Sequence, residues 1–236
     1  EALLADPEID VVYISLPNHL HAEWSIKAAA AGKHVLCEKP LALSVEDVDR
    51  VEDAAKRYGV IIAEAFMYRH HPQTLKVKDM IDSGVIGEPL LVKGAVTYNL
   101  SNPRNIRLDP AMGGGSLWDV GCYPLSYARF LLGAEPGEVF GWQNISASGI
   151  DDVFVAQAHF PGGAYAQFDC SFRLASRSFI EVVGSGGSIY IPEPYKPGKN
   201  VKVRLSRADG SSEMVRMPGA ELYIGEVEDL ADAILL

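Results

Sequence analysis

The sequence is poor in the features that mark several classes of protein. Its 236 residues include only three cysteines, an odd and widely spaced set, so we expect neither a disulfide framework nor a metal site. No apolar run approaches the roughly 18 residues that a membrane helix needs. No basic block interrupts a composition with a net charge of −10, which argues against nucleic acid and anionic membranes as partners. A cytoplasmic protein fits these absences.

The chain also lacks an initiating methionine, and it ends inside a helical pattern at residues 226–236. We therefore expect a fragment truncated at both ends and inactive by itself. No signal peptide is visible, but a sequence that begins at Glu1 says little about targeting.

Residues 1–67 alternate between two patterns. Short apolar runs without alternation predict buried parallel strands, and alanine-rich or amphipathic stretches between them predict helices. The predicted elements are, in order, a strand at 10–16, a helix at 21–31, a strand at 35–37, a helix at 44–59 and a strand at 60–65. Strands separated by helices predict a doubly wound α/β sheet.

After residue 67 the pattern changes. The sequence predicts a helix at 72–82, a strand at 90–98, and three hairpins spanning 153–172, 179–191 and 201–217. Several strands joined by hairpins predict an α+β domain with a large, mostly antiparallel sheet. The glycine-rich residues 184–187 lie between two of these strands and not before a helix, so they are interpreted as a turn and not as a nucleotide-binding motif.

The densest chemical signal is Glu38-Lys39-Pro40, which follows the apolar run Val35 to Cys37. A parallel strand that ends there places Glu38 and Lys39 at its carboxyl end, where open α/β sheets bind ligands. Pro40 restricts the backbone of Lys39. Lys39 is therefore a candidate catalytic group, and the alternative is a surface Glu-Lys pair that ends a strand.

Two other segments join a strand or a glycine run to the start of a helix. Residues 15–21 include Asn18 and two histidines, and they could line a ligand crevice or form a turn with an asparagine cap. Residues 112–125 contain three glycines and then Asp119 and Tyr123, which are four residues apart on a predicted helix at 117–130. These two side chains could both face one substrate, or the segment could be a flexible loop before a core tyrosine.

These segments, taken in order, resemble the Gfo/Idh/MocA oxidoreductases, the superfamily of glucose-fructose oxidoreductase and inositol dehydrogenase. The matching residues are 15–18 with His21, 31–40, 64–69 and 114–121, and the likeness covers nearly the whole chain. The resemblance implies that residues 1–67 are the C-terminal part of a Rossmann domain for NAD or NADP. It implies that residues 68–236 form a substrate-binding domain whose open sheet builds homo-oligomers, often dimers.

The resemblance also implies roles for individual residues. Tyr123 would be the acid/base, Lys39 its electrostatic partner and Asp119 a ligand of a substrate hydroxyl. The cofactor would be bound by Ser15, Leu16, Pro17, Asn18, His21, Glu38, Lys39, Pro40 and Arg69. An ammonium close to a phenol favours the phenolate, so we expect Lys39 to lower the pKa of Tyr123.

Two departures from the family pattern matter. Many members have histidine where this chain has Tyr123, which makes the chain similar to the branch of glucose-fructose oxidoreductase, NADP-dependent xylose dehydrogenases and dihydrodiol dehydrogenases. The glycine fingerprint of the first βα turn is absent, together with the residue that would separate NAD from NADP. NADP is slightly favoured by the branch.

The implied function is hydride transfer between a nicotinamide cofactor and a carbinol carbon of a sugar or cyclic diol, with oxidation of an aldose at C1 to the lactone favoured. The alternative is a nucleotide- or sugar-binding regulatory protein on the same fold without turnover, because a fold does not fix a function.

Overall fold

The computed structural model describes residues 1–236 and begins with a small parallel sheet. Its strands are β1 (Val11–Ile14), β2 (His34–Glu38) and β3 (Ile62–Ala65), in the order β1-β2-β3. They are joined by α1 (His21–Ala30) and α2 (Val45–Tyr58), as the alternating sequence pattern predicts. Both strand pairs are parallel. The carboxyl ends of the strands therefore open on one edge of this unit.

Local sequence signals fix the ends of α2. The Ser44 hydroxyl accepts the Asp47 amide N–H at 3.1 Å, and acidic residues fill the first turn. Gly59 ends the helix with φ of 65°, a left-handed conformation that glycine adopts without steric cost. Capping of this kind contributes about 1 kcal/mol to a helix.

The second unit is built on an eight-stranded sheet with the order β11-β10-β9-β8-β4-β7-β6-β5. All of its neighbours pair in antiparallel fashion except β4 and β7, which are parallel. The strands are β4 (Pro89–Thr97), β5 (Glu138–Ile145), β6 (Asp151–His159), β7 (Tyr165–Ser171), β8 (Arg177–Gly184), β9 (Gly187–Ile191), β10 (Lys202–Arg207) and β11 (Ser212–Arg216).

Three hairpins predicted from the sequence are confirmed as the pairs β6–β7, β8–β9 and β10–β11. Residues 184–187 form the β8–β9 turn, as expected. The edge strand β5 was not expected. All eight of its residues are exposed, so it carries no alternation of buried and exposed positions that a sequence pattern could reveal.

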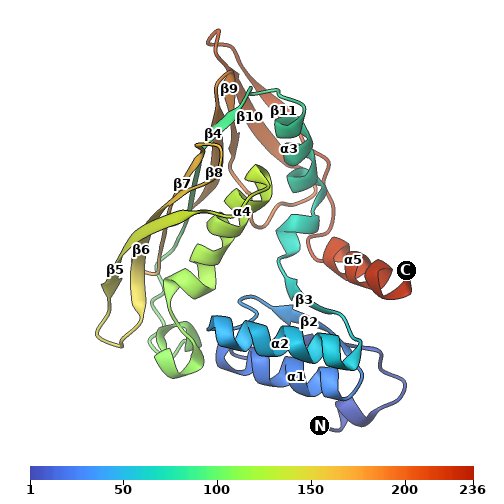
Figure 1. Ribbon diagram of the computed structural model, residues 1–236. Helices are drawn as coiled ribbons and strands as arrows, with labels where there is room; N and C mark the ends of the chain where they lie inside the picture. Colours follow the sequence, from blue (N-terminus) through green and yellow to red (C-terminus); the bar gives the residue numbers. More distant parts are fainter.

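Helices cover one face of the large sheet (Figure 1). They are α3 (Pro72–Asp82) and α4 (Cys122–Leu132), which pack with the inward side chains of the strands into a core of 25 buried residues. The other face of the sheet has no helix on it (Figure 1). The small parallel unit has no comparable core, because its largest buried clusters contain only four and three residues.

The remaining elements connect the two units. Helix α5 (Ile224–Leu235) follows β11 and returns to lie beside the parallel unit (Figure 1). Short helical turns are η1 (Leu3–Ala5), η2 (Asn18–Leu20), η3 (Met67–His70), η4 (Ile106–Leu108), η5 (Pro110–Met112) and η6 (Leu117–Gly121). None of the helices combines the length and the apolar character that crossing a membrane requires.

Candidate active site

A cleft of about 700 Å³ lies where the two units meet. One wall comes from the turns that follow β1 and β2, and the other from β4, β8 and the loop of residues 105–114. Ligands of open α/β sheets bind at the carboxyl ends of the strands, and this cleft occupies that position. Its lining includes predicted site residues from both units, namely Ser15, Leu16, Asn18, His21, Glu38, Lys39, Asp119 and Tyr123.

Lys39 is the residue that joins the two units across the cleft. Its Nζ donates to the backbone carbonyl of Asp119 at 2.5 Å and lies 3.2 Å from Asp119 Oδ1, although 80 residues separate them in sequence. Both side chains are about 10% exposed, at 11% and 10%. A charge pair so well shielded depends on both partners, because removal of one leaves a buried charge uncompensated.

The carboxylate of Asp119 has further partners. Its Oδ2 accepts Arg107 Nε–H at 2.8 Å and the Tyr98 hydroxyl at 3.0 Å. Burial alone would raise the pKa of Asp119, but the charges of Lys39 and Arg107 outweigh burial and hold this pKa below its usual value. Asp119 is therefore an ionised carboxylate with both oxygens engaged by the protein, and its role as a ligand of a substrate hydroxyl stays a prediction.

The helix that carries Asp119 and Tyr123 begins irregularly. Residues Leu117–Gly121 form a π-helical turn before α4, where the sequence predicted a regular helix from residue 117. Such turns are rare and occur frequently at functional sites. Here the wider turn still leaves Asp119 and Tyr123 on the cleft wall, as expected from their spacing.

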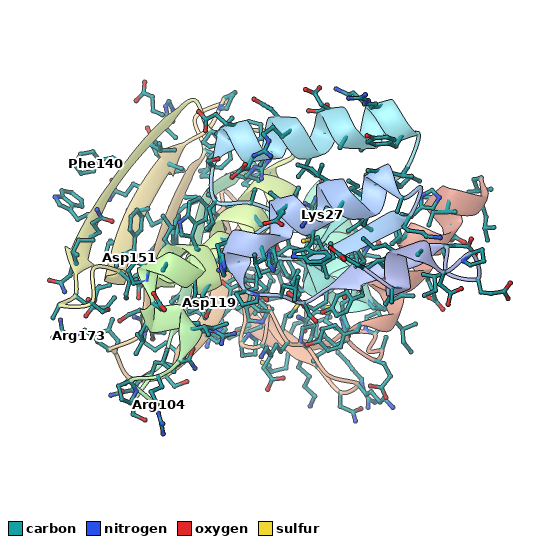
Figure 2. All side chains as sticks on the ribbon, turned by 90° about the horizontal axis from the view of Figure 1, so that it is seen from below. Lys27, Arg104, Asp119, Phe140, Asp151 and Arg173 are labelled. Atoms are coloured by element: carbon teal, nitrogen blue, oxygen red, sulfur yellow. The ribbon has the colours of Figure 1, made fainter.

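The glycine run before this turn seats the loop against its neighbours. Gly113 has φ of 76°, and a Cβ there would lie 2.9 Å from the Cβ of Asn18. The Asn18 side chain in turn donates to the Gly113 carbonyl at 2.9 Å. Asp151 then caps the π-helical turn, because its Oδ2 accepts the Ser116 hydroxyl and the Leu117 N–H, both at 2.7 Å. Figure 2 shows Asp151 beside the same segment that carries Asp119.

Tyr123 is buried against Met67, to whose sulfur its hydroxyl donates at 3.8 Å. Lys39 Nζ lies 5.0 Å from the centre of the Tyr123 ring and is engaged by Asp119. Burial raises the pKa of Tyr123 well above its ordinary value. A pKa below the ordinary value is therefore not found in this structure, because desolvation of the phenolate dominates. The effect of Lys39 on the titration of Tyr123 stays a prediction.

Other predicted cofactor-binding residues take different positions. Glu38 Oε1 accepts the Tyr13 hydroxyl at 2.5 Å at the edge of the cleft. Pro17 and Pro40 lie in the two strand-end turns without lining the cleft. Arg69 also lies outside it, with an exposed side chain whose guanidinium stacks 5.2 Å from the centre of the Phe130 ring. The structure does not bring Arg69 to the other site residues.

Tyr98 and Arg107 are residues of the site that were not assigned to it from the sequence. Both bind the Asp119 carboxylate and line the cleft. Tyr98 directly follows β4, and its polar end is not marked by any motif in the sequence. The signal that could have identified Tyr98 is its position as a polar residue at the end of a strand that faces the other unit.

Two family models match the chain. Residues 1–66 match an oxidoreductase family with an NAD-binding Rossmann fold, and residues 74–190 match the GFO/IDH/MocA C-terminal domain. The two matches divide the chain close to the boundary between the parallel unit and the large sheet.

Individual relatives agree with these matches. The chain is 42% identical to an uncharacterized oxidoreductase of Rhizobium meliloti and 35% identical to a D-xylose 1-dehydrogenase (NADP(+)) of Haloferax volcanii. In both cases the alignment covers 99% of this chain and 72% of the relative.

Solved structures show the same fold. A 3-ketoreductase of Actinomadura kijaniata in complex with NADP and TDP-benzene matches with a TM-score of 0.91 and 32% identity, over 99% of this chain and 73% of that one. An aldose-aldose oxidoreductase of Caulobacter crescentus with bound glycerol matches with a TM-score of 0.91 and 28% identity, over 99% and 71%. The two-unit fold, the cleft at the strand ends and these matches together show that this chain belongs to the Gfo/Idh/MocA family of NAD(P)-dependent oxidoreductases.

Proposed function

We propose that the protein transfers hydride between a nicotinamide cofactor and a carbinol carbon of a neutral sugar. The observation that carries this proposal is the convergence of Lys39, Asp119 and Tyr123, from two units, on one cleft at the carboxyl ends of parallel strands. A hydride-transfer site needs a surface for the cofactor, a proton donor or acceptor, and room for the substrate, and this cleft offers all three.

The strand-end turns fit a dinucleotide cofactor, preferably NADP. Ser15, Leu16 and Asn18 follow β1 and line the cleft, and Glu38 and Lys39 end β2 beside them. This is the edge at which doubly wound sheets bind nucleotides. The cofactor would supply or accept the hydride, and these residues would hold its nicotinamide end in the cleft. Arg69 has no place in this proposal, because its side chain points elsewhere.

Tyr123 would handle the proton. Its pKa is raised by burial, so the hydroxyl stays protonated at neutral pH and is poised to donate to an oxygen that gains negative charge. Lys39, fixed by Asp119, would place its positive charge beside the same oxygen. Tyr98 and Arg107 would act on Asp119 and thereby on Lys39.

Three of the four lysine and arginine side chains that line the cleft are paired with carboxylates, Lys196 being the exception, and this pairing favours a neutral substrate over a phosphorylated one. Lys39 and Arg107 share the Asp119 carboxylate, and Arg177 is held by Asp169 at 2.8 and 3.2 Å. An anion would have to compete with these carboxylates for the cations. Hydroxyl groups of a sugar can instead accept from the guanidinium N–H groups that remain free.

The direction of the reaction has two candidates. Oxidation of an aldose at C1 to a lactone is the direction favoured by the sequence, and it needs a base. The second candidate is reduction of a sugar ketone, which needs an acid that the Tyr123 hydroxyl on the cleft wall could supply. The full-length protein should be assayed with NADP⁺ and D-xylose and with NADPH and 1,5-anhydro-D-fructose, and the formation or loss of NADPH should be recorded. A protein that binds the nucleotide but turns over neither of these pairs, nor any related sugar, would be better explained as a regulatory protein.

We further propose that residues 68–236 bind the substrate and that the open face of the large sheet joins two copies of the chain. Phe140 and Trp142 of β5 are 57% and 62% exposed and contact each other edge to face, with ring centres 4.3 Å apart. Figure 2 shows Phe140 projecting from the outer side of the sheet. Light scattering of the wild type and of Trp142→Glu tests this proposal: a dimer that becomes monomeric supports it, and a wild-type monomer contradicts it.

A further inference from the structure

His21 is bound in a way that constrains its protonation. It is the first residue of α1 and is fully buried. Its Nδ1 lies 2.7 Å from the carbonyl oxygen of Pro40, and its Nε2 lies 2.7 Å from the carbonyl oxygen of Leu16. These carbonyls belong to the turns after β2 and β1, so one ring connects the two strand ends that line the cleft.

Both partners of the ring are carbonyl oxygens, which only accept hydrogen bonds. A neutral imidazole has one N–H, so its other nitrogen would direct a lone pair at an oxygen 2.7 Å away. Turning the ring over does not help, because carbon atoms would then take the two positions, and C–H···O contacts prefer roughly 3.3–3.6 Å. Two donors satisfy both contacts, and only the imidazolium has two donors.

We propose that His21 is held as a buried imidazolium that fastens the turn of Leu16 to the turn of Pro40 and thereby positions Lys39. The charge is a property of the fold, whereas the positioning of Lys39 rests on the proposed function of that residue. His21 is a positioning residue in this proposal and touches neither substrate nor the reacting atoms.

Several titratable side chains lie near the ring. Glu38 ends β2 and Lys39 follows it, and Glu64 of β3 accepts the Leu41 N–H at 2.8 Å just beyond Pro40. From the second unit, η5 packs near η2 and carries Asp109 at its start, and on the helical segment of His21 itself the nearest titratable groups are His19 and Glu23. None of these side chains bonds to the ring, whose hydrogen bonds are made to the two carbonyls. The start of α1 disfavours a cation, so the two carbonyls must outweigh the helix dipole.

The direct test is the protonation state of the ring. The full-length protein should be labelled with ¹⁵N-histidine, and the ring nitrogens of His21 should be observed by NMR at about pH 7.5, where free imidazole is mostly neutral. We expect both nitrogens of His21 to carry slowly exchanging protons. A single protonated nitrogen, with the other in its lone-pair form, would overturn the proposal. This measurement uses the wild type and does not depend on any variant folding.

A second test uses His21→Gln, which has one amide donor group and no charge, with His19→Gln as the matched control on an exposed histidine. We expect His21→Gln to raise the equilibrium constant for unfolding by about tenfold to a hundredfold near pH 6, the range for one lost hydrogen bond to a charged group. Above about pH 6.5 an unfolded histidine releases the proton that the folded ring keeps, so this difference should shrink as the pH rises. A difference that is independent of pH would mean that the ring is neutral and would contradict the proposal.

Discussion

The parallel unit and the large-sheet unit differ in the size of their buried cores and in the residues that they supply to the cleft. The parallel unit has three short strands and buries few side chains, whereas the large sheet has eight strands and a core of 25 residues. Yet the small unit supplies Lys39 and the strand-end turns, which carry most of the predicted cofactor contacts. The large unit supplies the helix and the loop that hold Lys39 in place through Asp119.

The proposed chemistry therefore lies at the junction, whereas most of the buried core lies in the larger unit. Parallel strands end at a common edge, so their turns gather polar groups without a large core. The antiparallel sheet, covered on one face by α3 and α4, provides the rigid support that a catalytic geometry requires. Variants at the junction should therefore lose turnover, whereas variants in the core should lose folding stability without a direct effect on the chemistry.

The largest effect is expected at the junction itself. Lys39→Met should lower kcat by about 10²–10⁴-fold, because it removes the charge beside the reacting oxygen. It also leaves the Asp119 carboxylate with fewer partners, and a broken buried ion pair costs roughly 3–5 kcal/mol. Kinetics with thermal unfolding checks both effects, and Lys56→Met, on the exposed side of α2, is the control. Turnover like that of the wild type would remove Lys39 from the mechanism.

Tyr123→Phe should cut kcat by about 10²-fold or more and leave folding intact, because only the hydroxyl is lost and the ring keeps its packing. Burial raises the pKa of the phenol, so in the wild type the rate of ketone reduction should not fall through loss of this proton below about pH 10. Tyr58→Phe, at an exposed tyrosine, is the control. Full activity of Tyr123→Phe would assign the proton to another group.

Two matched isoleucines compare the cores directly. Ile180 is fully buried in the 25-residue cluster, and Ile14 is buried in a cluster of four. Ile180→Ala should lower the free energy of unfolding by about 3–5 kcal/mol and Ile14→Ala by less, roughly 2 kcal/mol, because fewer neighbours lose contacts. Denaturant unfolding of both variants measures the difference, and equal costs would show that the small unit is packed as tightly as the large one.

The smallest effect concerns Glu226, a buried carboxyl on α5, the helix that packs back on the parallel unit. Burial and the charge of Glu38 raise its pKa to about 7. A raised pKa means that the folded protein binds the proton more tightly, so stability is full below about pH 4 and declines as the pH rises through 7. Glu226→Gln should therefore stabilise the protein at pH 8 by about 1–3 kcal/mol and leave its stability nearly unchanged at pH 4. The control Glu228→Gln, at an exposed neighbour, should leave stability nearly unchanged at both pH values. Thermal unfolding at the two pH values decides this.

Much of the fold could be predicted where local signals are strong. The Ser44 cap and Gly59 set the limits of α2, and the glycine-rich turns set the hairpins. The strand β5 could not be predicted, because all of its residues are exposed and no alternating pattern marks it. The parallel pairing of β4 with β7 could not be predicted either, because it joins segments far apart in the chain. The π-helical turn at Leu117–Gly121 has the same origin, since its start is capped by Asp151 from β6.

For the site, the sequence by itself determined which residues are present and which turn each occupies: Lys39 after an apolar strand, and Asp119 and Tyr123 four residues apart after a glycine run. Only the tertiary structure decided what these groups do to one another. It engaged Asp119 with Lys39, Tyr98 and Arg107, left Arg69 outside the cleft, and buried Tyr123 so that its pKa rises. The physical reason is that residue type and backbone pattern are local, whereas charge pairing and desolvation depend on which distant side chains the fold brings within a few ångströms.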